Sequence, residues 1–325
     1  MSGGRLFNNM RRTIVLSCFL GSISFASSVF AQGGTGIELD IAPGARQNGM
    51  GAAGVAMADD ATGVTWWNPA GLGFVNRSAI ELTYAQLAPN FASDINYNYL
   101  SYVHPLEGWG AFGIGAVFVS LGQITQTNTG GTELGTFGAN VFSPAIYYGT
   151  RLLPDFSVGA ALKYVRLQYA PTSLQGVGTT FAVDIGSLYR IPAARLNFGL
   201  TVQNLGPAVV FINDDAASPL SRMLKVGFSW EAISHQQVSL IMAGDYNQSL
   251  LNGDIRLYGT GLELRVAQQL AGRFGYFADP YGHVGDLTYG LGVSWGNLTL
   301  DYGTHPQAKD ADLDNVKKIT LGYRF

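Results

Sequence analysis

Residues suited to catalysis or metal binding are few in this chain and lie far apart. Asp310, Asp312 and Asp314 have the spacing of the first calcium ligands in an EF-hand loop. Such a loop has a glycine at its sixth position and a glutamate at its twelfth, where this chain has Asn315 and Leu321. The pattern therefore favours a solvated acidic loop, and weak calcium binding at the surface stays open.

The four histidines and the single cysteine form no catalytic or metal-binding pattern. His104, His235, His283 and His305 are scattered, and no two of them have the spacing of metal ligands. Cys18 has no second cysteine with which to form a disulfide or a thiolate metal site. We expect a protein that is not an enzyme, with no cofactor and no metal site.

Gly49, Gly51 and Gly54 match the dinucleotide-binding pattern G-x-G-x-x-G. That pattern needs a preceding strand, a following helix and an acidic residue about 20 positions later. Asp59 and Asp60 follow too soon, and no alternation of helices and strands comes after them. We interpret these glycines as points where the backbone packs closely.

The N-terminus has the three parts of a cleavable signal peptide. Arg11 and Arg12 are followed by a short apolar stretch from Thr13 to Phe25, and Val29-Phe30-Ala31 offers small or apolar residues to a signal peptidase. We expect cleavage before Gln32, which makes residues 1–31 the signal peptide. The apolar stretch is too short for a stable membrane-spanning helix, which needs about 20 apolar residues.

Two consequences follow from this export signal. Lipoprotein processing at Cys18 is disfavoured because too little apolar sequence precedes it. Removing residues 1–31 takes away arginines and no acidic residue, so the net charge becomes more negative than the −3 of the whole chain. An acidic protein lacks the basic face that nucleic acids require, so we expect no nucleic-acid partner.

The composition indicates a membrane protein built from strands. Charged residues make up 13% of the chain, about half the roughly 25% of a soluble domain. No stretch after Gln32 is apolar enough for a transmembrane helix. Apolar residues must therefore be interleaved singly with polar ones, as they are in strands whose two faces meet lipid and lumen.

That interleaving is visible along several segments. Leu287, Tyr289, Leu291, Val293 and Trp295 alternate with small or polar residues, so one face of the strand is apolar. Similar patterns predict about fourteen strands, an even number as bacterial barrels require. They fall near 78–86, 95–103, 110–121, 136–150, 157–169, 179–190, 194–204, 222–231, 236–246, 255–266, 272–278, 286–295, 297–304 and 316–325.

The connections between these segments alternate between tight turns and longer, polar loops. Two of the tight turns are at 104–109 and 151–156, and two of the longer loops are at 123–135 and 205–221. Short periplasmic turns and longer extracellular loops are typical of outer-membrane barrels. A soluble sandwich would show the same alternation of side chains but not this alternation of loop lengths. The fold class we predict is all-β, a transmembrane antiparallel β-barrel in the bacterial outer membrane.

The chain ends on an aromatic residue. Tyr323 and Phe325 resemble the C-terminal signal that the outer-membrane barrel-assembly machinery recognises. In a soluble protein such a strand would be an exposed edge that invites aggregation, whereas closure against the first strand removes the edge. We expect both residues to act as an assembly signal.

Several charged residues fall on the predicted inner face of the barrel. We expect them to pair with and solvate one another, and a functional polar path remains the alternative. They are Glu81, Lys163, Asp184, Lys225, Glu231, Asp301 and Arg324.

Residues 32–77 do not alternate but carry a dense set of motifs, GAR at Gly44, GMG at Gly49, ADDAT at Ala58 and WNPAGL at Trp67. In this order they resemble the start of the PorV/PorQ family, within the FadL-like superfamily of outer-membrane proteins. The resemblance implies a hatch, or plug, at 32–77 inside a barrel at 78–325. The residues that it assigns to the hatch are Gly49, Gly51, Asp59, Asp60, Asn68, Pro69, Ala70 and Gly71.

The resemblance also implies a function. Named members of the PorV/PorQ branch serve type IX secretion as partner-binding or cargo-carrier barrels, and Val209–Ile212 offers an apolar patch for docking. The alternative is FadL-like uptake of hydrophobic small molecules. Uptake predicts a lateral opening, for which a strand kink at a glycine-rich stretch such as Gly110–Gly115 is one place, although the sequence itself does not show an opening. A structural or adhesive surface barrel is a second alternative. Expected partners are outer-membrane lipid, the barrel-assembly machinery, and secretion proteins or secreted cargo, or else hydrophobic small molecules.

Overall fold

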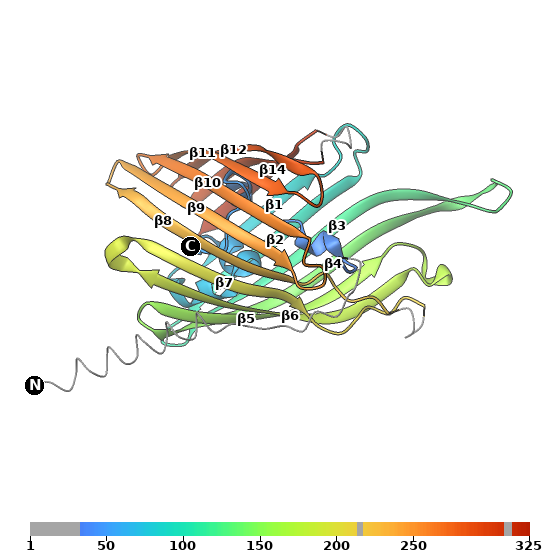
Figure 1. Cartoon of the computed structure of the whole chain (residues 1–325), viewed down its shortest axis with the longest axis horizontal. Helices are drawn as coiled ribbons and strands as arrows, with labels where there is room; N and C mark the ends of the chain where they lie inside the picture. Colours follow the sequence, from blue (N-terminus) through green and yellow to red (C-terminus); the bar gives the residue numbers. More distant parts are fainter. Residues whose placement is uncertain (1–32, 213–216, 309–313) are drawn as a thin grey trace, which may run out of the picture. The chain divides into compact units, whose positions relative to one another are not determined.

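The computed structural model describes residues 33–212, 217–308 and 314–325, and within them fourteen antiparallel strands close into a barrel (Figure 1). Each strand pairs with its neighbours in the chain. The strands are β1 (Ala79–Gln86), β2 (Ile95–Leu106), β3 (Gly110–Thr127), β4 (Glu133–Leu153), β5 (Phe156–Gln168), β6 (Val177–Ile191), β7 (Leu196–Leu205), β8 (Met223–Ser234), β9 (Val238–Ser249), β10 (Arg256–Val266), β11 (Leu270–Asp279), β12 (Val284–Trp295), β13 (Leu298–His305) and β14 (Val316–Arg324).

The last strand closes the barrel against the first. β1 and β14 pair along their lengths, from Ala79 opposite Arg324 to Gln86 opposite Lys317. Closure leaves neither strand as an unpaired edge. The predicted fold class is therefore confirmed.

Side chains alternate between the two faces of the wall as the sequence predicts. On β12, Leu287, Tyr289, Leu291 and Val293 are exposed on the outer face, whereas Thr288 is fully buried. Exposed apolar side chains on every second residue fit a surface that faces lipid. The chain is thus a closed β-barrel with an apolar outer face.

Connections at one end of the barrel are short, such as 107–109, 154–155 and 296–297, and those at the other end are mostly longer, such as 206–222 and 306–315. By this difference we assign the first end to the periplasm and the second to the extracellular side. Within the described residues, no helix is long and apolar enough to cross a membrane. The predicted signal peptide at 1–31 lies outside the described residues.

The predicted loop at 123–135 is wrong, because β3 and β4 continue through most of it. Gln123 to Thr127 pair with Gly138 to Glu133, and only a short turn joins the two strands. β2 begins opposite Leu121 and β5 ends opposite Asn140, so no described strand pairs with either side of this two-stranded extension. The sequence prediction failed because a ribbon without a buried face needs no alternation of apolar residues.

Residues 33–77, which we call the luminal segment, lie inside the barrel. Their helices are η1 (Ile37–Asp40), α2 (Ala45–Gly49), η2 (Gly63–Trp67) and η3 (Pro69–Phe74), drawn in blue among the strands of the barrel in Figure 1. Helix α2 packs against β11 to β14, and η3 packs against β3 to β6. The segment thus bridges two distant parts of the inner wall. Two short helices, η4 (Thr172–Leu174) and η5 (Pro192–Ala194), lie in connections between strands.

Candidate functional site

Glycines allow the luminal segment to lie directly against the wall. Gly51 has a φ of 73°, and a Cβ there would lie 2.4 Å from the carbonyl oxygens of Thr260 and Tyr276. Gly49 lies against the wall in the same way, since its Cβ would be 3.0 Å from the Cα of Gly290. The glycines of the apparent nucleotide motif are therefore packing positions, as the sequence analysis interpreted them.

The Asn-Pro-Ala run forms the turn that begins η3. The Asn68 side chain accepts a hydrogen bond from the backbone N–H of Ala70 at 3.1 Å and donates to the carbonyl oxygens of Val55 and Ser187, each at 3.0 Å. Pro69 occupies the first helical turn, where its missing N–H costs nothing. One buried side chain thus joins two parts of the luminal segment to strand β6.

Ala70 and Gly71 continue this packing. The hydroxyl of Ser157, on β5, donates to the carbonyl oxygen of Ala70 at 2.7 Å. A Cβ at Gly71 would lie 2.4 Å from the Cβ of Ala58, so only glycine fits between these two stretches of the luminal segment.

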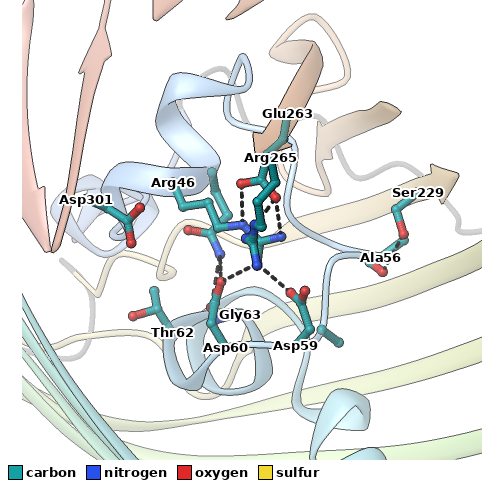
Figure 2. Close-up of polar contacts among 12 residues, drawn as sticks. Arg46, Ala56, Asp59, Asp60, Thr62, Gly63, Ser229, Glu263, Arg265 and Asp301 are labelled. Atoms are coloured by element: carbon teal, nitrogen blue, oxygen red, sulfur yellow. Dashed lines mark hydrogen bonds and ion pairs between the residues drawn. The ribbon is translucent and has the colours of Figure 1, made fainter. Parts of the chain in front are cut away.

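The strongest polar connection between the luminal segment and the wall is made by Arg46, on α2 (Figure 2). Its guanidinium donates to both carboxylate oxygens of Glu263, on β10, at 2.8 and 2.9 Å. It also pairs with Asp59 at 2.6 Å and with Asp60 at 2.9 Å. Burial favours the neutral form, but the three carboxylates raise the pKa of Arg46 well above its ordinary value, so it stays charged.

The charge network continues along the wall. Glu263 is fully buried and also accepts hydrogen bonds from Arg265 at 3.0 Å and Arg273 at 2.7 Å. Arg273 in turn pairs with Asp301, on β13, at 2.7 Å. The network therefore spans three strands and ties them to α2.

Asp59 and Asp60 differ in exposure and partners. The Asp59 side chain is 52% exposed, whereas that of Asp60 is 7% exposed. Asp60 accepts hydrogen bonds from the Gln47 side chain at 2.9 Å and from the backbone N–H of Gly63 at 2.6 Å. Asp60 thus fixes the start of η2, and Asp59 lies where the network meets the periplasmic mouth.

Sequence reasoning missed Arg46, Glu263 and Arg273 as parts of this network. A signal existed for Glu263, because it lies between the outward-facing Leu262 and Leu264 and so must face the lumen. Of the luminal charges that the sequence singled out, Lys163 and Asp184 do pair, at 2.6 Å. The periodicity of strands places such residues on the inner face but does not say which of them meet.

The predicted assembly residues lie at the periplasmic end of β14. Phe325 donates its backbone N–H to Ser78 at 2.9 Å, and its ring lies 5.0 Å from that of Tyr323. Both rings are exposed on the outer face. Their recognition by the assembly machinery stays a prediction. Of the acidic residues with EF-hand spacing, Asp310 and Asp312 lie outside the described residues.

On the extracellular side of the luminal segment is a cavity of about 390 Å³, which we call the well. Its walls are mostly apolar and include Trp66, Trp67, Leu257 and Phe277. Lys225, on β8, lies among these side chains with its ammonium 3.9 Å from the centre of the Trp66 ring.

Comparison with protein families identifies the chain. The model of the family described as type IX secretion system protein PorV matches residues 33–253. The chain belongs to the PorV family. The matched region includes the whole luminal segment and the wall up to the loop after β9, so the resemblance drawn from the motifs is confirmed.

Solved structures with the same fold are FadL-like channels. The toluene transporter TbuX of Ralstonia pickettii is 15% identical, covering 86% of this chain and 97% of that one, with a TM-score of 0.58. The monoaromatic hydrocarbon channel CymD is 16% identical over 88% of this chain and 98% of that one, with a TM-score of 0.57. The toluene transporter TodX of Pseudomonas putida is 12% identical over 86% and 96%, with a TM-score of 0.53. At these identities the likeness shows the fold alone. No curated protein matches the chain.

Proposed function

We propose that this chain is a non-enzymatic component of protein secretion that binds a partner protein or secreted cargo at its extracellular side. Membership in a family of type IX secretion system proteins supports the secretion role. The observation that carries the partner-binding role is the extension of β3 and β4 beyond their neighbours, residues 123–127 and 133–138, which we call the ribbon.

The ribbon has the properties of a docking strand pair. Its two strands bond to each other, and beyond Gln123 and Gly138, whose outer backbone groups bond to the side chains of Asp94 and Gln168, each strand has an outer edge with no described strand beside it. Natural proteins usually protect such edges with lysine or proline, yet Glu133 is the only charged residue of the ribbon and it has no proline. Leu134 is 59% exposed and Ile124 is 41% exposed. A partner strand can therefore add to either edge and pack on these side chains.

The apolar patch expected at Val209–Ile212 is smaller than its sequence suggests. Val209 is fully buried and exchanges backbone hydrogen bonds with Ser218, whereas Val210 is 38% exposed and Ile212 is 62% exposed. The backbone of the patch is already bridged at Val209 and Val210, so the ribbon, whose outer edges have no strand beside them, is the better candidate for strand addition.

The luminal segment favours docking over conduction. It fills the lumen between β3 to β6 and β11 to β14 and is held by the buried Arg46–Glu263 pair. We infer that it acts as a hatch that stays in place, because releasing it would break the buried two-point pairing of Arg46 with Glu263. A folded or extended polypeptide would then be carried by this barrel and not passed through it.

The test is affinity purification from gently solubilised outer membranes, with co-purifying proteins identified by mass spectrometry. In one variant, an Asn-Gly turn replaces residues 124–137, since Gln123 and Gly138 face each other and such a turn closes a hairpin. A second variant, Ile212→Ser, serves as the control on the same side. We expect a large translocon protein or secreted cargo to co-purify with wild type and with Ile212→Ser, but not with the shortened ribbon. A barrel that is isolated alone in all three cases contradicts the proposal.

The second candidate function is uptake of hydrophobic small molecules. The apolar well favours this function. The backbone pairing of β12 with β13 also stops at Gly290 and Gly303, so the wall is less tightly closed beyond that point, where the Thr304 side chain bonds to the backbone of Tyr289. A lateral opening at Gly110–Gly115 is excluded, because β3 pairs there with β2 throughout. The solved structures with this fold include toluene and monoaromatic hydrocarbon channels. Faster uptake of a radiolabelled hydrocarbon by cells that express the protein would support this function. A structural or adhesive barrel, the third possibility, would need neither the ribbon nor the well.

A further inference from the structure

Four arginines at the periplasmic mouth of the barrel lack an acidic partner. Within the described residues none of them forms an ion pair, whereas the arginines of the network around Glu263 all do. A guanidinium stays charged in proteins and presents its N–H donors in a planar fork, which fits a carboxylate with two hydrogen bonds. The four are Arg77 before β1, Arg151 on β4, Arg190 on β6 and Arg324 on β14.

Arg190 is held in place by Phe74, on η3. Its guanidinium lies 3.8 Å from the centre of the Phe74 ring and donates to the carbonyl oxygen of Ala58 at 3.3 Å. The guanidinium of Arg151 lies 6.0 Å from the centre of the same ring. The backbone carbonyl of Asp155 accepts a hydrogen bond from the backbone N–H of Arg190 at 2.8 Å, but its carboxylate pairs with neither guanidinium. Two positive charges therefore share one ring, and the aromatic contact orients the fork of Arg190 before any ligand arrives.

A groove of about 370 Å³, which we call the periplasmic groove, connects Arg190 with two more of these arginines. Phe74 of the luminal segment lines it, together with Arg77 and Arg324. Arg324 pairs across the β1–β14 ladder with Ala79, which follows shortly after Arg77, so these two arginines belong to one part of the wall. β6 is not adjacent to β1 or β14 in the barrel. The groove therefore has arginines on two separate parts of the wall.

Asp59 and Asp60 also line the groove, but both are already paired. The guanidinium of Arg46 lies 2.6 Å from Asp59 and 2.9 Å from Asp60. Neither carboxylate forms an ion pair with an arginine of the groove. The positive charges of the groove are therefore left to pair with a ligand, and complementary charge across an interface selects the partner and fixes its register.

We propose that the periplasmic groove binds an acidic segment of a polypeptide, whose carboxylates pair with Arg190 on one side of the mouth and with Arg77 and Arg324 on the other. Charges on separate parts of the wall require several carboxylates on one extended ligand, and a small anion would satisfy only one side. Headgroups of membrane lipid lie outside the wall, whereas the luminal segment forms one side of the groove. The site does not depend on the proposed secretion role, because the ribbon lies at the opposite end of the barrel.

The test uses the full-length barrel in nanodiscs of zwitterionic phosphatidylcholine and measures the fluorescence anisotropy of labelled peptides at low salt. The probes are hexaglutamate and hexaglutamine, which share a length and differ in charge. Wild type is expected to bind hexaglutamate about tenfold or more tightly than hexaglutamine, and added salt should reduce the difference because it screens exposed charges. Arg77→Gln and Arg190→Gln are each expected to weaken hexaglutamate binding about threefold or more, and together to abolish the preference.

The matched control is Arg256→Gln, which removes the same charge from an exposed arginine at the extracellular end of β10 and is expected to keep the preference. Migration of unboiled and boiled protein on a denaturing gel establishes that each variant is a folded barrel. If Arg190→Gln does not fold, Arg77→Gln, at an exposed residue before β1, is the deciding variant and must still show its threefold loss.

Three results would overturn the proposal: equal binding of both peptides by wild type, an undiminished preference after both groove substitutions, or the same loss in Arg256→Gln as in Arg77→Gln. Displacement of hexaglutamate by inorganic phosphate at constant ionic strength would assign the groove to a phosphate group and would also contradict the proposal.

Discussion

Replacing Glu263 by glutamine removes the charge at the centre of the network that joins the luminal segment to the wall. Glu263 is fully buried and accepts hydrogen bonds from Arg46, Arg265 and Arg273, at distances from 2.7 to 3.0 Å. Glutamine has nearly the same shape but only one oxygen, and its amide group donates towards guanidinium groups that also donate. The substitution therefore tests charge and hydrogen bonding with little change in packing.

The size of the effect follows from what each arginine retains. Removing one partner of a buried ion pair costs about 3–5 kcal/mol because the other charge is left unpaired. Arg46 still has Asp59 and Asp60, and Arg273 still has Asp301. We therefore expect Glu263→Gln to lower the free energy of unfolding by about 3 kcal/mol, at the lower end of that range.

The assay is urea unfolding in detergent micelles, followed by tryptophan fluorescence and by gel mobility of unboiled samples. Glu231→Gln is the matched control, because Glu231 forms no ion pair with a described residue, and we expect it to change the free energy of unfolding by about 0.5 kcal/mol or less. A loss below about 1 kcal/mol for Glu263→Gln, or equal losses for both variants, would refute the view that this network holds the luminal segment in place.

Three further predictions concern packing and assembly. We expect Gly51→Ala to lower the free energy of unfolding by about 3 kcal/mol, because of strain at positive φ and a Cβ 2.4 Å from two wall oxygens. Gly108→Ala, with a φ of 77° but open space around it, should lower it by about 1 kcal/mol. Equal losses would contradict this reasoning. Asn68→Ala leaves buried backbone groups unpaired and should cost about 1–3 kcal/mol in the same urea assay; an unchanged midpoint would argue against the capping role. Phe325→Ala should reduce the amount of folded barrel in outer membranes, measured by gel mobility, more than Leu291→Ala does. Both variants remove an exposed apolar side chain, but only the first alters the predicted assembly signal. Equal yields would count against an assembly signal.

The barrel could be predicted from the sequence because strand periodicity is a local property. Leu287, Tyr289 and Leu291 show their outward face in the sequence itself, and the tight turns show where strands end. The ribbon could not be predicted in the same way, because residues 123–138 have neither a lipid-facing nor a buried face to create a pattern.

The luminal segment was found through its motifs, but its contacts were not. Asn68 and Gly51 could be named because turn chemistry and close packing restrict the residue types at those positions. The pairing of Arg46 with Glu263 joins residues 217 positions apart, and it depends on how an irregular segment lies in the lumen. No periodic pattern in the sequence indicates how this segment lies in the lumen.

The central claim, a secretion component that acts through its extracellular ribbon, is tested most directly by the proteins that cells release. The gene would be deleted in a bacterium that carries it, and the proteins of the culture medium would be compared after complementation with wild type and with the shortened ribbon. We predict that deletion removes a defined set of secreted proteins, that wild type restores them, and that the shortened ribbon, although folded in the outer membrane, does not. An unchanged set of secreted proteins after deletion, together with slower growth on a hydrophobic carbon source, would contradict the account and favour uptake.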